Sequence, residues 1–261
     1  MHEKPIGIVA GVGPFAGLDL LSKVLEETVA NCDQDHLPIY SLSQPNEILD
    51  RTEYLLGIVT ENPGCAIASQ LQKLATMGAE VAGIPCNTAH APAIFSVIES
   101  ELKKANCPIK LLHMIREVGR FLHENYPEVE AIGVLSTTGT YRAQIYPQVL
   151  EPLGFTIIVP EETMQVELVH PSIYDPVYGI KANGGATETA VSHLHVAAKT
   201  VKAQGAQAII LGCTEIPLAI PSEKLAGMIT IDPTRILARA LIRESNVAKM
   251  PEGTVTHYTS G

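Results

Sequence analysis

Two cysteines of this chain follow apolar runs and precede polar, helix-initiating residues. The first lies in residues 84–90, IPCNTAH, and the second in residues 211–217, LGCTEIP. Unpaired backbone N–H groups and the positive end of a helix dipole stabilise a thiolate at such a position and lower its pKa from about 8.5 toward neutrality. Cys86 and Cys213 are therefore candidates for a base and an acid that act on one carbon atom.

The residues beside these cysteines could bind a carboxylate. Asn87 and Thr88 follow the first cysteine and Thr214 follows the second, and exposed N–H groups would complete an anion cradle. If the α-carbon of an amino acid lay between the two sulfurs, one thiolate would remove the α-proton while the other thiol protonated the opposite face. Donors aimed at the α-carboxylate would stabilise the charge that develops. The pair indicates racemisation that needs no cofactor.

The two cysteines occupy equivalent places in an apparent internal repeat. Residues 6–9, IGIV, resemble residues 132–135, IGVL, at an offset of 126. Gly78-Ala79-Glu80 resembles Gly205-Ala206-Gln207 at an offset of 127, which is also the separation of Cys86 and Cys213. Three landmarks at nearly one offset predict two homologous halves. If the matches are only generic, the cysteines still follow parallel strands, where open α/β sheets bind their ligands.

Short apolar runs alternate with stretches of helical period, which is typical of βα units around parallel sheets. We expect buried strands at residues 6–10, 80–84, 131–135, 155–159, 208–211 and 228–231. Amphipathic helices are expected at residues 18–30, 65–77, 93–104, 187–202 and 234–243. The predicted fold class is α/β, with two pseudo-symmetric Rossmann-like domains, mainly parallel sheets and an active site in the interdomain cleft. The first domain would comprise residues 1–112 with 229–261, and the second residues 113–228.

Composition excludes several classes of function. The 261 residues are 46% hydrophobic and carry a net charge of −10, which disfavours nucleic acid and anionic membranes as partners. The absence of Trp and the presence of only 4 Phe argue against an aromatic stacking platform, so a small polar substrate is expected. A cytoplasmic location is expected because no export signal or membrane-spanning run is visible. The 5 cysteines, spread over a chain of this length, are expected to be reduced.

The quoted motifs resemble the aspartate/glutamate racemase family. Besides the two cysteine segments, the resemblance includes Gly11-Val12-Gly13-Pro14, Asp50-Arg51-Thr52, Thr138-Gly139-Thr140 and Ile180-Lys181, and it runs from about residue 6 to about residue 240. It is closest to the aspartate racemase branch, because the glutamate branch typically carries Asp-Ser-Gly and Cys-Thr-His where this chain has residues 10–12, AGV, and 213–215, CTE. One departure is Val12, where the branch usually has Met, which leaves broader specificity open.

The resemblance implies a fold, a cofactor requirement and roles for individual residues. It implies two pseudo-symmetric domains, no pyridoxal phosphate or other cofactor, commonly a homodimer, and a small dicarboxylic amino acid as substrate. Cys86 and Cys213 match the acid/base thiols, and Arg51 and Lys181 match the clamp for the side-chain carboxylate. The residues that match positions around the α-carboxylate are Asn87, Thr88, Thr138 and Thr214. An arginine fork suits a second carboxylate.

Several residues have plainer interpretations. Glu215 could assist proton transfer or act as an N-terminal acid of a helix. Gly13 is an auxiliary candidate, although tight-turn packing beneath the substrate explains its segment better than a dinucleotide loop does. A zinc site built from Cys86, His90 and Cys213 is disfavoured, because the short Cys-x-x-Cys spacing of structural zinc is missing, and no metal is expected. The other three cysteines, Cys32, Cys65 and Cys107, are expected to have packing roles.

Three functions therefore compete. The leading interpretation is a racemase of aspartate, with glutamate also open as a substrate. The second is a related cysteine-dependent isomerase, racemase or decarboxylase of another small acid, of the hydantoin racemase or maleate isomerase type. The third is a noncatalytic protein that binds a small ligand.

Overall fold

The computed structural model describes residues 3–220 and 223–251. Its contacts divide the described residues into two compact units, one made of residues 3–117 together with 234–251, and the other made of residues 118–220 and 223–233. The chain passes from one unit to the other after residues 117 and 233, in each case five residues beyond the boundary expected from sequence. At the second boundary the reason is β9 (Met228–Ile231), which pairs with β7 (Ala208–Gly212) and therefore belongs to the second unit. The last part of the first predicted domain, residues 252–261, lies outside the described residues.

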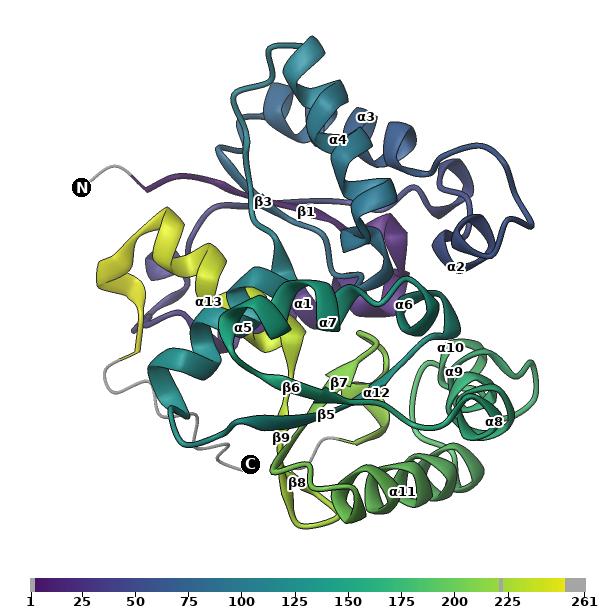
Figure 1. Cartoon of the computed structure of the whole chain (residues 1–261). Coiled ribbons are helices and arrows are strands. Elements are labelled where there is room, and N and C mark those ends of the chain that lie inside the picture. The colour runs from purple at the N-terminus through teal and green to yellow at the C-terminus, as the bar shows by residue number, and fades with distance from the viewer. Residues whose placement is uncertain (1–2, 221–222, 252–261) are drawn as a thin grey trace. The chain divides into compact units, whose positions relative to one another are not determined.

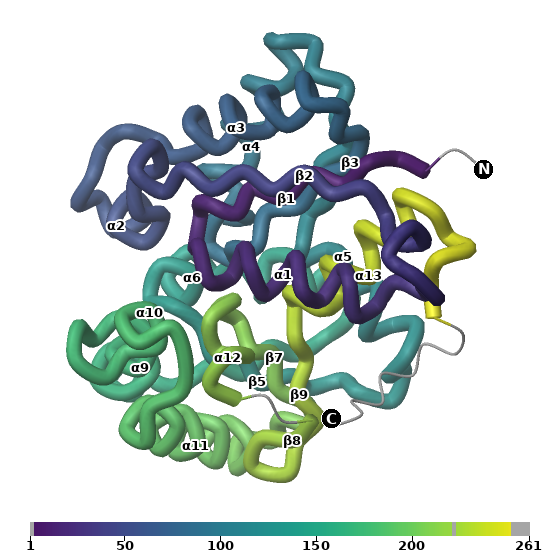
Figure 2. Tube along the Cα trace, turned by 180° about the vertical axis from the view of Figure 1, so that it is seen from behind, coloured from purple at the N-terminus to yellow at the C-terminus, as the bar shows by residue number. Residues whose placement is uncertain are grey.

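The first unit is built on a parallel sheet. Within the described residues its strand order is β2-β1-β3-β4, and every pairing is parallel. Helices α3 and α4 cover one face, and α1 and α13 cover the other (Figure 1), while Figure 2 shows the strands side by side from behind. The strands are β1 (Ile6–Val9), β2 (Ile39–Leu42), β3 (Val81–Gly83) and β4 (Lys110–Leu111). The helices are α1 (Pro14–Glu27), α2 (Arg51–Leu55), α3 (Gly64–Met77), α4 (Pro92–Lys104) and α13 (Pro233–Ser245).

The second unit repeats this plan. Its described strands run β6-β5-β7-β9-β8, parallel except for the antiparallel edge strand β8, with α11 on one face and α5 and α7 on the other (Figure 1). The strands not yet bounded are β5 (Ala131–Ser136), β6 (Thr156–Ile158) and β8 (Lys224–Leu225). The helices are α5 (Met114–Asn125), α6 (Thr138–Arg142), α7 (Ile145–Leu150), α8 (Glu162–Met164), α9 (His170–Tyr174), α10 (Ile180–Asn183), α11 (Glu188–Ala203) and α12 (Ile216–Ala219).

The shorter helical turns lie mostly in the connections. The 3-10 turns are η1 (Ala10–Val12), η2 (Asp33–Asp35), η3 (Pro45–Glu47), η4 (Thr88–His90), η5 (Glu151–Leu153) and η7 (Val247–Lys249), and η6 (Gln165–Val169) is a π-helical turn. Proline at the first position starts α1, α4 and α13, where its missing N–H costs nothing. For that reason α1 begins four residues before the helix expected from residue 18. These observations confirm an α/β fold with mainly parallel sheets.

The internal repeat predicted from sequence has a counterpart in the packing. Gly78 and Gly205 follow α3 and α11 with φ of 109° and 107°, a conformation that favours glycine. Helices α3 and α11 pack against strands β1 and β5, which carry Gly7 and Gly133. A Cβ on Gly7 would meet the Ala79 Cβ at 3.0 Å, and one on Gly133 would meet the Ala206 Cβ at 3.3 Å. The same small residues thus let each helix pack closely against its central strand, at the offset found in the sequence.

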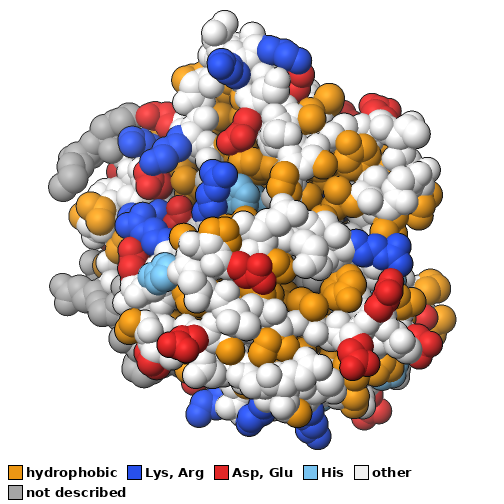
Figure 3. All heavy atoms as spheres, in the orientation of Figure 1, with side chains coloured by type: hydrophobic (Ala, Val, Ile, Leu, Met, Phe, Trp, Pro, Cys, Tyr) orange, Lys and Arg blue, Asp and Glu red, His pale blue; other side chains and the backbone are white. Residues whose placement is uncertain are grey.

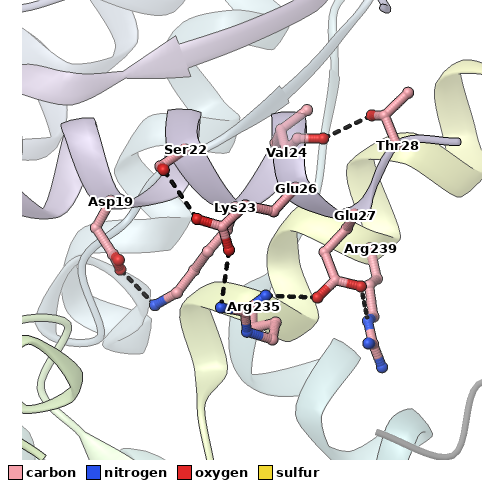
Figure 4. A network of polar contacts seen from close by, with 9 residues as sticks. All are labelled: Asp19, Ser22, Lys23, Val24, Glu26, Glu27, Thr28, Arg235 and Arg239. Carbon is pink, nitrogen blue, oxygen red and sulfur yellow. Dashed lines mark hydrogen bonds and ion pairs between the residues drawn. The ribbon is translucent and has the colours of Figure 1, made fainter. Parts of the chain in front are cut away.

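A charged cluster joins the first and last helices of the first unit (Figure 4). Glu27 on α1 accepts hydrogen bonds from Arg235 Nη1 at 2.6 Å and Arg239 Nε at 2.7 Å, both on α13. The Glu27 side chain is only 9% exposed, whereas Glu26, which contacts Arg235 Nη2 at 3.0 Å, is 52% exposed. One buried carboxylate therefore neutralises two arginines. Through this contact α13 binds to α1, which lies over 200 residues earlier in the chain.

Replacing Glu27 with Gln should lower the free energy of unfolding by about 2 to 3 kcal/mol, because two largely buried cations lose their shared counter-charge. The matched control is Glu26→Gln, which removes an exposed partner of the same arginine and should cost less than about 1 kcal/mol. Urea unfolding followed by circular dichroism measures both. Equal losses in the two variants would contradict this assignment.

Candidate active site

Cys86 lies at the carboxyl edge of the first sheet. Strand β3 ends at Gly83, the Cys86 N–H donates to the Ile84 carbonyl at 2.8 Å, and the turn η4 follows. Cys86 is 9% exposed, and Asn87 and Thr88 are buried beside it. The structure therefore brings these three sequence-predicted residues together. It does not place Cys86 at the start of a long helix, because α4 begins only at Pro92, and the expected helix dipole is reduced to that of a single turn.

His90 supports the loop that carries Cys86. Its Nδ1 lies 2.8 Å from the Cys86 carbonyl oxygen, so this nitrogen donates the hydrogen bond. The ring is 1% exposed and packs against Phe95 and His113, with ring centroids 5.3 Å and 4.8 Å away. Burial lowers the pKa of His90 to about 4 and that of His113 to about 2. Both rings are therefore neutral at pH 7, and His90 fixes the cysteine loop.

Arg51 is buried in the same unit. It opens α2, which packs against η4, and Asp50 caps that helix by accepting from the Thr52 and Glu53 N–H groups at 2.7 and 2.9 Å. Arg51 Nη2 donates to the Val12 carbonyl, and Nη1 donates to the Leu49 carbonyl at 3.1 Å. Arg51 therefore ties the turn after β1 to the helix beside η4. Only 8% of Arg51 is exposed, so it is not a solvated surface residue.

The first glycine-rich turn is packed tightly, as expected from sequence. A Cβ on Gly11 would lie 2.6 Å from the Gln44 backbone nitrogen, and one on Gly17 would lie 2.4 Å from the Ala10 Cβ. Gly13 is extended at the start of α1, and its carbonyl accepts from the Gly17 N–H at 2.8 Å. Val12 is buried, and its carbonyl contacts Arg51. These residues shape the backbone at the carboxyl end of β1.

Cys213 belongs to a buried polar cluster in the second unit. It directly follows β7, and its Sγ lies 3.0 Å from Glu215 Oε2, which also accepts from Thr214 Oγ1 at 3.2 Å. Glu215 Oε1 forms an ion pair with Lys181 on α10, and the Glu215 side chain is 5% exposed. Lys181 Nζ lies 5.5 Å from the centroid of the Tyr174 ring, a cation–π distance. The structure therefore brings Lys181 and Tyr174 to the Cys213-Thr214-Glu215 segment, from which they are distant in the sequence.

The electrostatics of this cluster correct the expectation of a thiolate at Cys213. Burial, and then the charge of Glu215, raise the pKa of the Cys213 thiol well above its usual range. Burial alone would raise the pKa of Glu215 and lower that of Lys181, but their mutual attraction reverses both shifts, so the carboxylate and the ammonium are ionised. Helix α12 has only four residues, and the Glu215 side chain makes no capping bond to it. Glu215 therefore stands at the N-terminus of a short helix, but its side chain is directed to Cys213, Thr214 and Lys181.

Thr138 begins α6, two residues after the end of β5 in the same unit. Strands β5 and β7 pair in parallel up to Ser136 and Gly212, so Thr138 and Cys213 follow adjacent strands at one sheet edge. The Thr138 N–H lies 3.5 Å from His170 Nδ1. Gln165, which is fully buried, donates from Nε2 to the Ser136 carbonyl at 2.9 Å and lies 3.4 Å from Thr138 Oγ1. Thr138 is thus held in place from two sides.

Some residues of these clusters were missed from the sequence. Gln165 opens the π-helical turn η6, a kind of distortion that is frequent at functional sites, but nothing in its sequence context marks it. Tyr146 is 2% exposed, and burial raises its pKa well above the usual range. His113 is 23 positions from His90, and no spacing rule would pair them. Each lies beside its cluster through tertiary packing alone.

The remaining cysteines and the surface match the sequence expectations in part. Cys32 is exposed in a bend and Cys65 is exposed on helix α3, so neither has the packing role expected for it, while Cys107 is half-buried. Basic and acidic side chains are interspersed on the face drawn in Figure 3.

In residues 3–220 and 223–251, no cluster of three or more His, Cys, Asp or Glu is placed to hold a metal ion. No helix in these ranges has the length and hydropathy of a membrane span.

Comparison with known proteins places this chain in one family. The family model described as Asp/Glu/Hydantoin racemase matches residues 9–241. The chain therefore belongs to the Asp/Glu/hydantoin racemase family, and the resemblance noted from its motifs is confirmed. The family supports racemase or isomerase activity as the general class.

Individual relatives are distant. A broad-specificity amino-acid racemase of Bacillus subtilis is 27% identical over 169 residues, covering 61% of this chain and 66% of that protein. A glutamate racemase of Limosilactobacillus fermentum is 26% identical over 243 residues, covering 90% and 78%. The structure of Picrophilus torridus aspartate racemase is 27% identical with a TM-score of 0.74, covering 93% and 94%. A Pyrococcus horikoshii aspartate racemase homologue, at 23% identity and a TM-score of 0.70, shares the fold over 93% and 99%.

The buried histidines predict how stability depends on pH. The folded protein holds His90 neutral down to about pH 4, whereas the unfolded chain protonates it below about 6.5. The unfolded state therefore binds more protons between these values, and stability falls as the pH falls through this window. His90→Gln should be less stable at pH 7, because it loses packing, but should lose less further stability between about pH 7 and 5.

Urea unfolding midpoints at the two pH values measure this slope. His195→Gln, a partly exposed histidine on α11, is the control and should keep the slope of the unaltered protein. An unchanged slope in His90→Gln would refute the role of the buried ring.

Proposed function

We propose that this protein interconverts L- and D-aspartate, with glutamate as a second substrate, without pyridoxal phosphate, by a two-base mechanism in which Cys86 and Cys213 exchange protons with one α-carbon. The observation that carries the proposal is that each cysteine lies just beyond the equivalent strand of its own unit, Cys213 directly after β7 and Cys86 in the loop after β3, and is flanked by buried hydroxyl or amide groups. The family membership of the chain supports the reaction class.

The mechanism follows from the residues at each strand end. One sulfur, as a thiolate, removes the α-proton, and the other, as a thiol, delivers a proton to the opposite face, which inverts the centre. Asn87 and Thr88 in one unit, and Thr138 and Thr214 in the other, supply donors for the α-carboxylate, whose negative charge grows as the proton leaves. All four side chains are at most 6% exposed, so their dipoles act in a weakly screened environment.

A dicarboxylic substrate is favoured by the cations near these strand ends. In a chain of net charge −10, a second carboxylate needs specific cations, and Arg51 and Lys181 are the family-matched pair. Lys181 is partly exposed although it is paired with Glu215, and an ammonium group has three donors, of which the ion pair uses one. Val12, whose carbonyl contacts Arg51, stands where the aspartate racemase branch usually has the longer Met. We therefore include glutamate beside aspartate.

Replacing either cysteine tests the proposal. Cys86→Ser and Cys213→Ser should each lower the rate of aspartate racemisation by about a thousandfold or more, because a serine hydroxyl is a much weaker acid/base group, while L-aspartate still binds. Chiral chromatography of L- and D-aspartate, L- and D-glutamate and L- and D-alanine measures turnover, and calorimetry measures binding.

Cys65→Ser is the matched control, since Cys65 is an exposed cysteine on α3, and its activity should be unchanged. Full activity in either active-site variant would refute the two-cysteine mechanism. Turnover of alanine at the rate of aspartate would refute the dicarboxylic substrate.

A further inference from the structure

The two cysteines lie in different surroundings. The Cys213 Sγ faces a carboxylate at 3.0 Å, within a cluster whose acid and thiol are both almost fully buried. The loop that carries Cys86 is held through its backbone, because His90 Nδ1 donates a hydrogen bond to the Cys86 carbonyl. A two-base racemase needs one thiol and one thiolate at the start of each turnover. The surroundings of Cys213 therefore bear on which cysteine holds the proton.

The chemistry of the Glu215 carboxylate fixes the direction of the hydrogen bond. An ionised carboxylate has acceptors and no donors, and its ion pair with the Lys181 ammonium keeps it ionised. Thr214 Oγ1 donates to the same oxygen that faces the sulfur. The proton between Cys213 and Glu215 must therefore be carried by sulfur, because a thiolate at 3.0 Å from a carboxylate would place two buried negative charges in contact.

From this geometry we infer that Glu215 is a positioning residue that keeps Cys213 protonated in the resting enzyme, so that Cys213 begins as the acid and the thiolate is left to Cys86. This inference rests on the proposed two-cysteine function. Glu215 would also hold Lys181 away from the sulfur, since the ammonium would otherwise stabilise a thiolate there. The burial of the thiol and the charge of Glu215 raise the pKa of Cys213, in agreement with this assignment.

Other groups near the Cys213 thiol do not reverse the rise in its pKa. Tyr146 is neutral at pH 7, because its pKa is raised, and the charge of Asp232 contributes to that shift. Tyr174 contacts Lys181 through its ring. The titratable or charged groups that act on Cys213 or on its neighbours are Glu215, Lys181 on α10, Tyr146 on α7, Tyr174 on α9 and Asp232 after β9. Lys181 is the cation of this set, and it is paired with Glu215.

The proton balance of the cycle follows from this resting state. The Cys86 thiolate takes the α-proton of one enantiomer, and the Cys213 thiol gives its proton to the other face of the same carbon. The enzyme then holds a thiol at Cys86 and a thiolate at Cys213. The resting state returns when Cys213 gains a proton and Cys86 loses one to solvent, or when the opposite enantiomer is processed. Glu215 favours this return because it repels the Cys213 thiolate.

Thiolate absorbance in the ultraviolet, measured without substrate, tests the inference. For the full-length protein, the spectrum of Cys213→Ser is subtracted from that of the unaltered protein, so that tyrosines and the other cysteines cancel. No thiolate should appear at Cys213 between about pH 6 and 9, although a free thiol titrates near 8.5. In Glu215→Gln, corrected with Glu215→Gln/Cys213→Ser, the midpoint should fall by about 1 to 3 pH units, because Lys181 remains and the anion is gone.

Two further variants control this shift. Lys181→Met in the Glu215→Gln background should abolish the new thiolate, because its stabilising cation is removed. Glu161→Gln, which changes an exposed acid of the same unit, should titrate like the unaltered protein. A Cys213 thiolate below about pH 8 in the unaltered protein, or an unchanged midpoint in Glu215→Gln, would overturn the inference.

The infrared S–H stretching band gives a second readout that does not depend on the folding of the Glu215 variants. At pH 7 the difference between the unaltered protein and Cys213→Ser should contain an S–H band shifted by its hydrogen bond, and the absence of that band would overturn the inference. Neither measurement requires turnover. A protein that racemises no amino acid but shows these signals would refute the proposed function and retain the role of Glu215. A protein that racemises aspartate but lacks these signals would refute the role of Glu215 and retain the proposed function.

Discussion

The parallel direction of the strands is the constraint on which the functional clusters depend. When all the strands of a sheet point the same way, their carboxyl ends and the loops that follow them collect at one edge. Cys86 and the turn after β1 share this edge in the first unit, and Cys213 and Thr138 share it in the second. The parallel pairings in turn require crossover helices, and close packing of those helices uses the same glycine and alanine positions in both units.

The two edges are alike in position but different in charge. The first unit holds Cys86 in a loop fastened by a neutral, buried histidine. The second holds Cys213 against an ionised pair, Glu215 and Lys181. Repeated topology therefore supplies two equivalent thiol positions, and local electrostatics distinguishes them. The proposed two-base inversion uses this combination, because its two groups act on opposite faces of one carbon and begin in different protonation states.

Much of the fold could be predicted from sequence because its signals are local. The apolar runs at residues 208–211 and 228–231, and the glycine at position 78 that ends a helix, each follow from residues within a few positions. Strands β2, β4 and β8 were missed, since the first is half-exposed and each of the other two has only two residues. The start of α1 was misplaced because the helical period was counted from Leu18, although Pro14 starts the helix.

The candidate site was predictable in its residues and less so in its electrostatics. Cys86, Asn87 and Thr88 lie together because they are contiguous, and Cys213 and Glu215 are two positions apart. The ion pair of Glu215 with Lys181 and the contact of Gln165 with Thr138 join segments about 30 residues apart, and no periodicity encodes them. The expected lowering of the Cys213 pKa was wrong for the same reason. A motif shows that a helix follows the cysteine, but the length of that helix and the burial of the nearby acid depend on tertiary packing.

The isotopic pattern of racemisation in deuterium oxide tests the central claim most directly. If two thiols act on opposite faces of one α-carbon, L-aspartate should give D-aspartate that carries one α-deuterium, while the remaining L-aspartate stays unlabelled at early times. The same pattern should hold from D-aspartate. Mass spectrometry after chiral separation measures both pools. Product that retains its original α-proton, or substrate that gains deuterium as fast as product forms, would contradict a two-base mechanism.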